Sequence, residues 1–207
     1  MPRNRLAVRQ VFASSNPMQF PDLLPDQCAT ELPNRLHAYR AGREIEPNDA
    51  IHFFVEDFKF QGAWNYPNRV AKAVRDSGWP AVCEPDFSLW LDMPLAQQIH
   101  AIYQRRWCAR KWQDYGATVI PILSAGDERT WSFAWDGIPQ HCVVALQVQT
   151  VTDFGYLSAM VQHAIEATRP KAICLYGKQT DRLRIDVRHQ WYKPFTQQMR
   201  ERINGQG

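Results

Sequence analysis

Two carboxylates that flank a proline, Glu84 and Asp86, form the group in this sequence with the clearest chemical potential. Such a pair could act as a general acid and a general base if a third carboxylate such as Asp57 lay beside it. Tyr176 and Lys178 are the further candidates for an enzyme that acts on a nucleotide or another small molecule. The alternative is structural, because an aspartate in a loop is also a common turn opener.

A metal-dependent nuclease is a specific version of this hypothesis, and the sequence argues against it. Its two fragments, Pro85-Asp86 and Asp57-Phe-Lys59, occur in the reverse of the order that such a site needs. The chain also lacks a phosphate-binding GxxxxGK[ST] loop, an HExxH motif and the His-hydrophobe-His pair of rolling-circle nickases. The spacing therefore predicts no metal site, although a divalent cation at Asp57, Glu84 and Asp86 stays an open alternative.

A basic stretch late in an expected helix is the second candidate. It contains Arg105, Arg106, Trp107, Arg110, Lys111 and Trp112. Cations there could contact phosphates while the aromatic rings stack on bases, which predicts nucleic-acid binding. The alternative is that the helix dipole favours cations near the C-terminal end and that the tryptophans belong to the core.

The C-terminal part of the chain carries an excess of positive charge. From Lys178 onward there are seven basic residues against three acidic ones, a net +4, which leaves the rest of the +3 chain at −1. Arg182, Arg184 and Arg188 join the basic helix as candidate nucleic-acid contacts. Solvated surface charge is the alternative, but a basic arm beside a near-neutral body favours a polyanionic partner such as DNA or RNA.

Short apolar runs alternate with helical patterns along the chain. The apolar runs are 51–55, 81–83, 117–123, 142–146 and 172–176, and the helical patterns are 70–78, 92–116 and 157–165. This alternation predicts one α/β domain with a mostly parallel sheet, and an incomplete or distorted barrel is the alternative. Ligands of such folds bind at the carboxyl ends of the strands, where Asp57, Glu84, Asp86, Tyr176 and Lys178 are expected.

The regular core is expected over residues 51–178. Residues 1–50 hold six prolines and are expected to form an irregular lead-in with one short helix near 31–39. Residues 179–207 are expected to form the basic arm. Period-two alternation over 130–136 predicts a short strand or a hairpin arm.

Composition places the chain among ordinary globular domains. The 207 residues are 45% hydrophobic and 22% charged, far from the composition of disordered proteins. No apolar run is long enough to cross a bilayer and the basic start lacks a signal-peptide pattern, so we expect a cytoplasmic location without a membrane partner. The five cysteines show no CxxC spacing and are expected to be buried thiols.

The order of several short motifs resembles a known family. These motifs are Glu84-Pro-Asp-Phe-Ser88, Asp92-Met-Pro94 with Gln97, the strand from Gly116 to Pro121, Gly137-Ile-Pro139 and Leu175-Tyr-Gly177. Together they are similar to the phage and bacterial family known as domain of unknown function 4417. The resemblance covers residues 50–178, implies an association with phages and other mobile elements, and brings no catalytic residue or cofactor. Ala125-Gly126 departs from the family pattern, in which a tryptophan follows the serine.

Three functions are consistent with these features. The first is a phage or mobile-element protein that contacts nucleic acid during replication, packaging or genome protection. The second is an enzyme at the carboxyl ends of the strands. The third is a virion or host-interaction protein that uses its tryptophans at an interface with a host or phage protein.

Overall fold

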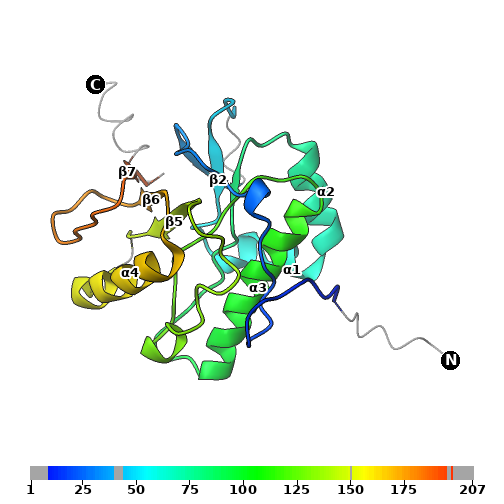
Figure 1. Cartoon of the computed structure of the whole chain (residues 1–207). Coiled ribbons are helices and arrows are strands. Elements are labelled where there is room, and N and C mark those ends of the chain that lie inside the picture. Colours follow the sequence, from blue (N-terminus) through cyan, green and yellow to red (C-terminus); the bar gives the residue numbers. More distant parts are fainter. Residues whose placement is uncertain (1–8, 40–43, 150, 195–196, 198–207) are drawn as a thin grey trace.

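The computed structural model describes residues 9–39, 44–149, 151–194 and 197, and these residues form two parallel sheets flanked by helices (Figure 1). The first sheet has the order β1 (Leu36–Ala38), β2 (Ala50–His52), β3 (Val82–Cys83) and β4 (Val119–Ile120). The second has the order β5 (Val143–Gln147), β6 (Ala172–Tyr176) and β7 (His189–Tyr192).

The two sheets lie edge to edge. Every paired strand is parallel to its neighbour, and an isolated parallel bridge between Ile122 and Ala145 connects the β4 and β5 segments. Strand order therefore follows the chain from β1 to β7. Within the described residues β7 does not pair with β1, so the array is open and not a closed barrel. The prediction of an α/β fold with a mostly parallel sheet is confirmed.

The helices pack on one face of this array. The longer ones are α2 (Pro67–Asp76), α3 (Leu95–Gln113) and α4 (Phe154–Thr168), and α1 (Gly62–Asn65) and three 3-10 turns, η1 (Pro25–Gln27), η2 (Asp57–Lys59) and η3 (Glu128–Thr130), complete the set. The α4 helix begins where Asp153 accepts a hydrogen bond from the backbone N–H of Tyr156, a side-chain N-cap. No described helix is both long enough and apolar enough to cross a bilayer.

Alternation along the strands divides the core into two parts. In β6, Ile173 and Leu175 face the helices, while Cys174 and Tyr176 face the opposite side. The buried cluster on that opposite side draws residues from every strand and none from a helix. The sheets therefore curve around a small inner core, and the helices cover the outer face.

Several local predictions need correction. Residues 36–38 form β1, where we expected a short helix near 31–39, and residues 128–137 form η3 and turns, where we expected a strand over 130–136. Within the expected strand 117–123, residues 119–120 form β4. The β3 ladder ends there because the N–H of Ile122 donates to the side chain of Glu84, and Ile122 bridges to Ala145 instead. The five cysteines are free and buried, as predicted.

Candidate functional site

The carboxylate of Glu84, directly after β3, is held in a buried network. It forms an ion pair with Arg106 of α3, and both side chains have zero exposure. Its second oxygen accepts a hydrogen bond from the backbone N–H of Ile122 at 2.9 Å. Arg106 also donates from Nε to the carbonyl of Asp136 at 3.0 Å. Glu84 therefore joins β3, α3 and the segment after β4, and its charge is already compensated.

Arg105, the neighbour of Arg106 on α3, is also completely buried. Its Nη2 donates to the carbonyl of Ser124, but Nε and Nη1 have no hydrogen-bond partner within the described residues. Burial lowers the pKa of its guanidinium to about 10, an effect that nearby Glu84 and Asp86 oppose. The group remains a cation near neutral pH, so a charge with unpaired donors lies beneath the ends of β3 and β4.

Asp86 lies in the loop after β3 and is partly buried. Burial raises the pKa of its carboxyl to about 7; Arg105 acts against this shift, and the charges of Asp57 and Glu84 add to it. A carboxyl with this pKa exchanges a proton near neutral pH, as a general acid or base must. Among the sequence candidates, Asp86 is the one whose surroundings suit acid–base chemistry.

Asp57, the first residue of η2, lies beside the same segment. Its two carboxylate oxygens accept hydrogen bonds from the backbone N–H and the hydroxyl of Ser88, at 3.1 and 3.0 Å. This contact ties η2 to the loop after β3. The structure thus brings Asp57, Glu84 and Asp86 to one end of the first sheet. Within the described part, no group of three His, Cys, Asp or Glu side chains is arranged to hold a metal ion.

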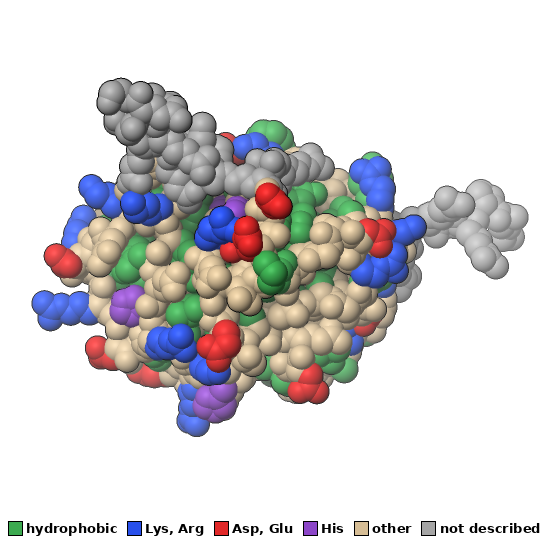
Figure 2. Space-filling view, turned by 90° about the horizontal axis from the view of Figure 1, so that it is seen from above, with side chains coloured by type: hydrophobic (Ala, Val, Ile, Leu, Met, Phe, Trp, Pro, Cys, Tyr) green, Lys and Arg blue, Asp and Glu red, His purple; other side chains and the backbone are tan. Residues whose placement is uncertain are grey.

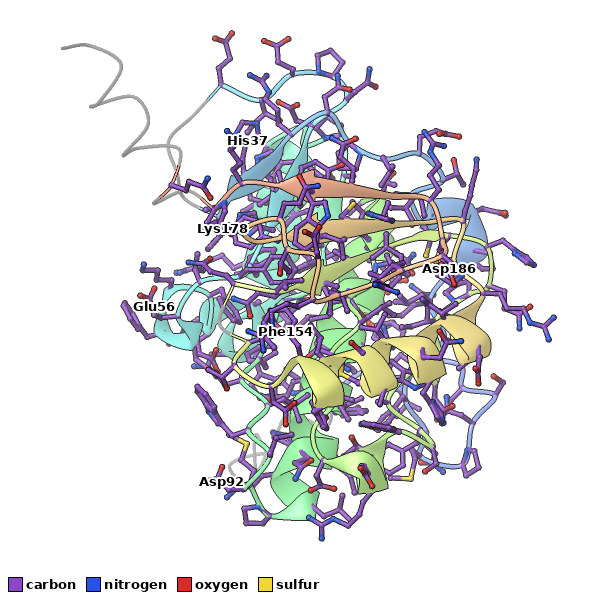
Figure 3. The ribbon with its side chains drawn as sticks, turned by 90° about the vertical axis from the view of Figure 1, so that its left-hand side faces the viewer. His37, Glu56, Asp92, Phe154, Lys178 and Asp186 are labelled. Carbon is purple, nitrogen blue, oxygen red and sulfur yellow. The ribbon has the colours of Figure 1, made fainter. Side chains whose placement is uncertain are left out.

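The other two enzyme candidates lie elsewhere. Tyr176 belongs to the inner core, where its ring lies 4.1 Å from the ring of His52 and 5.2 Å from that of Phe54. Lys178 is exposed at the start of the connection from β6 to β7, near the same edge of the molecule as Glu56 (Figure 3). The predicted five-residue set is therefore split between the helix-covered face, the inner core and the surface.

The basic stretch of α3 is largely internal. Arg105, Arg106, Trp107 and Trp112 are buried. Arg110 forms an ion pair with Asp114 at 2.6 Å, and its side chain is only 16% exposed; that of Lys111 is 13% exposed. This helix therefore presents little free positive charge to a polyanion.

The C-terminal cations have a different environment. All of those in the described residues are exposed, on the connection from β6 to β7 or directly after β7. They are Lys178, Arg182, Arg184, Arg188 and Lys193. In Figure 3 Lys178 and Asp186 lie at opposite ends of this connection, which returns the chain to the start of β7 because β7 is parallel to β6. Arg200 and Arg202, counted in the basic arm, lie outside the described residues.

The packing around Gly126 explains why a glycine occupies this position, where the chain departs from the family pattern. A Cβ on Gly126 would overlap Gln98 Oε1 and would lie 2.6 Å from its Cδ. Gln98 is completely buried and holds the loop by donating to the carbonyl of Met93 at 2.8 Å and accepting from the N–H of Asp127 at 2.9 Å. We did not single out Gln98 from the sequence, because a glutamine in a helix usually faces solvent.

Comparison with known proteins agrees with the motif order. The family model described as Domain of unknown function (DUF4417) matches residues 12–193. Two proteins named Gene 1 protein, from Mycobacterium phage D29 and Mycobacterium phage L5, are 33% identical to the chain over 181 residues. The alignment covers 84% of this chain, 65% of the D29 protein and 77% of the L5 protein, so the chain spans less than two thirds of the D29 protein. No solved structure matches the chain.

The expected resemblance is thereby confirmed, and so is the link to phage proteins at the level of homology. The matched residues extend beyond the 50–178 that the motifs alone indicated, and they include β1 and β7. This chain belongs to the DUF4417 family and is homologous to the Gene 1 proteins of mycobacteriophages.

Proposed function

We propose that this protein binds nucleic acid through an exposed basic segment, residues 178–193, in the service of a phage or other mobile element. The observation that carries the proposal is the exposure of five cations in this segment, against two acidic residues, Asp181 and Asp186. A net charge of +3 over sixteen residues attracts a polyphosphate backbone, because binding releases condensed counterions. Replication, packaging or protection of a phage genome would each use such contacts.

The position of the segment supports the same function. Figure 1 places the β6–β7 connection at the left-hand edge of the molecule, and Figure 2 shows Lys and Arg side chains along the left-hand edge of the face seen from above. Neighbouring contacts leave much of this charge accessible: Arg188 lies 3.4 Å from Glu31, with both side chains more than 60% exposed. Such a solvent-exposed pair is weak and can be exchanged for a phosphate contact.

A titration of the full chain with labelled single- and double-stranded DNA and RNA, followed by fluorescence anisotropy at several salt concentrations, tests the proposal. We expect binding whose logarithm falls linearly with the logarithm of salt concentration. The variant Arg182→Gln, Arg184→Gln, Arg188→Gln should weaken binding and reduce the salt slope by roughly 2 to 3, because up to three phosphate contacts are removed.

The matched control removes three exposed cations from α2, at the opposite side of the molecule in Figure 1, by Arg69→Gln, Lys72→Gln and Arg75→Gln. It has the same change in net charge and should bind nearly as the unmodified protein does. Equal loss in both variants would mean that only overall charge matters. That result, or the absence of binding at low salt, overturns the proposed role of residues 178–193.

A further inference from the structure

Among the described residues, the network around Glu84 leaves the buried positive charge of Arg105 without an ion-pair partner. Arg105 and Arg106 are both fully buried cations, while Glu84 is the one carboxylate that forms an ion pair with either of them in the described residues. Glu84 is occupied by Arg106 and by the N–H of Ile122. In the part of the chain that the structure describes, Arg105 has a single acceptor, the carbonyl of Ser124. A guanidinium has five N–H donors, and three of those in Arg105, on Nε and Nη1, are unpaired.

This arrangement is costly unless something compensates it. A buried donor without an acceptor destabilises the folded state, and the effect is larger when the group is charged. Asp86 is the other carboxylate whose charge acts on Arg105, but no ion pair within 4.0 Å connects the two among the described residues. An acceptor supplied from outside the chain would satisfy the unpaired donors and the unbalanced charge together.

We propose that Arg105 and Asp86 form a binding site for a small oxyanion, either a carboxylate or a phosphate-like group, at the carboxyl ends of β3 and β4. Arg105 supplies the cation and the planar donors that suit carboxylate and phosphate oxygens. Asp86 lies on the side of the site that retains partial exposure, in the loop of residues 84–94, which contains no helix or strand.

Asp86 makes the site sensitive to pH. The charged groups that act on its carboxyl are Arg105 on α3, Asp57 at the start of η2, and Glu84 directly after β3. Protonated Asp86 is neutral and can donate a hydrogen bond to an oxyanion, whereas ionised Asp86 repels it. Oxyanion binding is therefore expected to be stronger below pH 7 than above it.

Sulfate and acetate are suitable probes, because neither changes charge between pH 6 and pH 8.5. Binding to the full chain is measured by isothermal titration calorimetry and by the shift of the thermal unfolding midpoint. We expect at least one probe to bind and to raise the midpoint, with an affinity that falls roughly tenfold from pH 6 to pH 8.5 as Asp86 ionises. A preference for sulfate indicates a phosphate-like ligand, and a preference for acetate a carboxylate.

Two variants locate the effect. Arg105→Lys retains the charge but loses the planar donors, and it should weaken binding at least tenfold; Arg129→Lys, on an arginine whose side chain is 60% exposed, is the control and should bind normally. If Arg105→Lys does not fold, the variant Asp86→Asn tests the site instead. It should bind as tightly at pH 8.5 as at pH 6.

The proposal is overturned if neither probe binds, if Arg105→Lys binds as the unmodified protein does, or if Asp86→Asn keeps the original pH dependence. The residues involved differ from those of the basic segment 178–193. A failure of nucleic-acid binding therefore leaves this site standing, and the converse also holds.

Discussion

Arg106 and Glu84 form an ion pair with both side chains completely buried, between α3 and the end of β3. The pair also fixes the segment after β4, since Glu84 accepts from the N–H of Ile122 and Arg106 donates to the carbonyl of Asp136. Removing one partner leaves the other as an uncompensated buried charge. The loops that carry the candidate oxyanion site are therefore held in place by this pair.

Breaking the pair should strongly destabilise the protein. Arg106→Met should lower the free energy of unfolding by about 3–5 kcal/mol, because Glu84 is left buried and unpaired. Adding Glu84→Gln to that variant should recover part of the loss, as urea unfolding of the single and double variants would show. Arg110→Met, which removes the ion pair with Asp114 on the same helix, is the control and should cost about 1 kcal/mol or less. Additive effects of the Arg106 and Glu84 substitutions would contradict the coupling.

Asp86 should make folding less favourable as pH rises. Its folded-state pKa of about 7 lies above that of an ordinary aspartate, so the folded state binds the proton more tightly than the unfolded state. The resulting stability is complete below the unfolded pKa near 4 and is lost as pH rises through 7. Relative to Asp86→Asn, the unmodified protein should lose about 1–3 kcal/mol between pH 5 and pH 8 in urea titrations. Parallel pH profiles of the two proteins would argue against a raised pKa.

His52 should have the opposite effect. Burial lowers the pKa of its imidazole to about 3, with a smaller contribution from His37. The unfolded state then binds the proton more tightly, and stability is lost as pH falls below about 6.5 toward 3. Asn can replace the Nδ1 acceptor that binds the N–H of Phe54 at 3.1 Å. The stability difference between the unmodified protein and His52→Asn should therefore shrink from pH 7.5 to pH 5, and chemical-shift titration of the His52 ring should show no protonation over that range.

Gly126 should not tolerate a side chain. Gly126→Ala would push Cβ into the buried amide of Gln98, whose hydrogen bonds hold the loop after β4, and we expect a loss of about 1–3 kcal/mol in thermal or urea unfolding. Gly62→Ala is the matched control. A Cβ there would meet Val70 at an ordinary 3.8 Å, within a helix, so stability should stay unchanged or rise by up to about 1 kcal/mol. Equal effects at both glycines would contradict the packing argument.

The candidate site was predictable in part. The sequence predicted that Asp57, Glu84 and Asp86 lie at one end of the first sheet, because the carboxyl ends of parallel strands meet at the same edge. The same argument wrongly grouped Tyr176 with them. Which face of the sheet a side chain occupies depends on the register of its strand and on the curvature of the sheet, and the sequence does not show these. It also could not show that Glu84 is occupied by Arg106, which lies 22 positions away on a helix.

Local sequence determined the elements whose signals are strong over several residues. The apolar runs 142–146 and 172–176 form β5 and β6, and the helical patterns 92–116 and 157–165 form α3 and α4. The spacing of apolar residues within each segment is enough to indicate its secondary structure. Weak segments such as β1 and β7 were missed, because their pairing depends on neighbours distant in the chain.

Only the tertiary structure decided what the charged residues do. Arg105 and Arg106 look like solvated cations in the sequence, and their burial follows from the carboxylate and carbonyl acceptors that β3, the loop after β4 and residues 134–136 place around α3. Arg182, Arg184 and Arg188 are exposed, and Arg188 pairs with the exposed carboxylate of Glu31. The composition of the chain thus set its overall charge, while the fold determined which cations are internal and which are available to a partner.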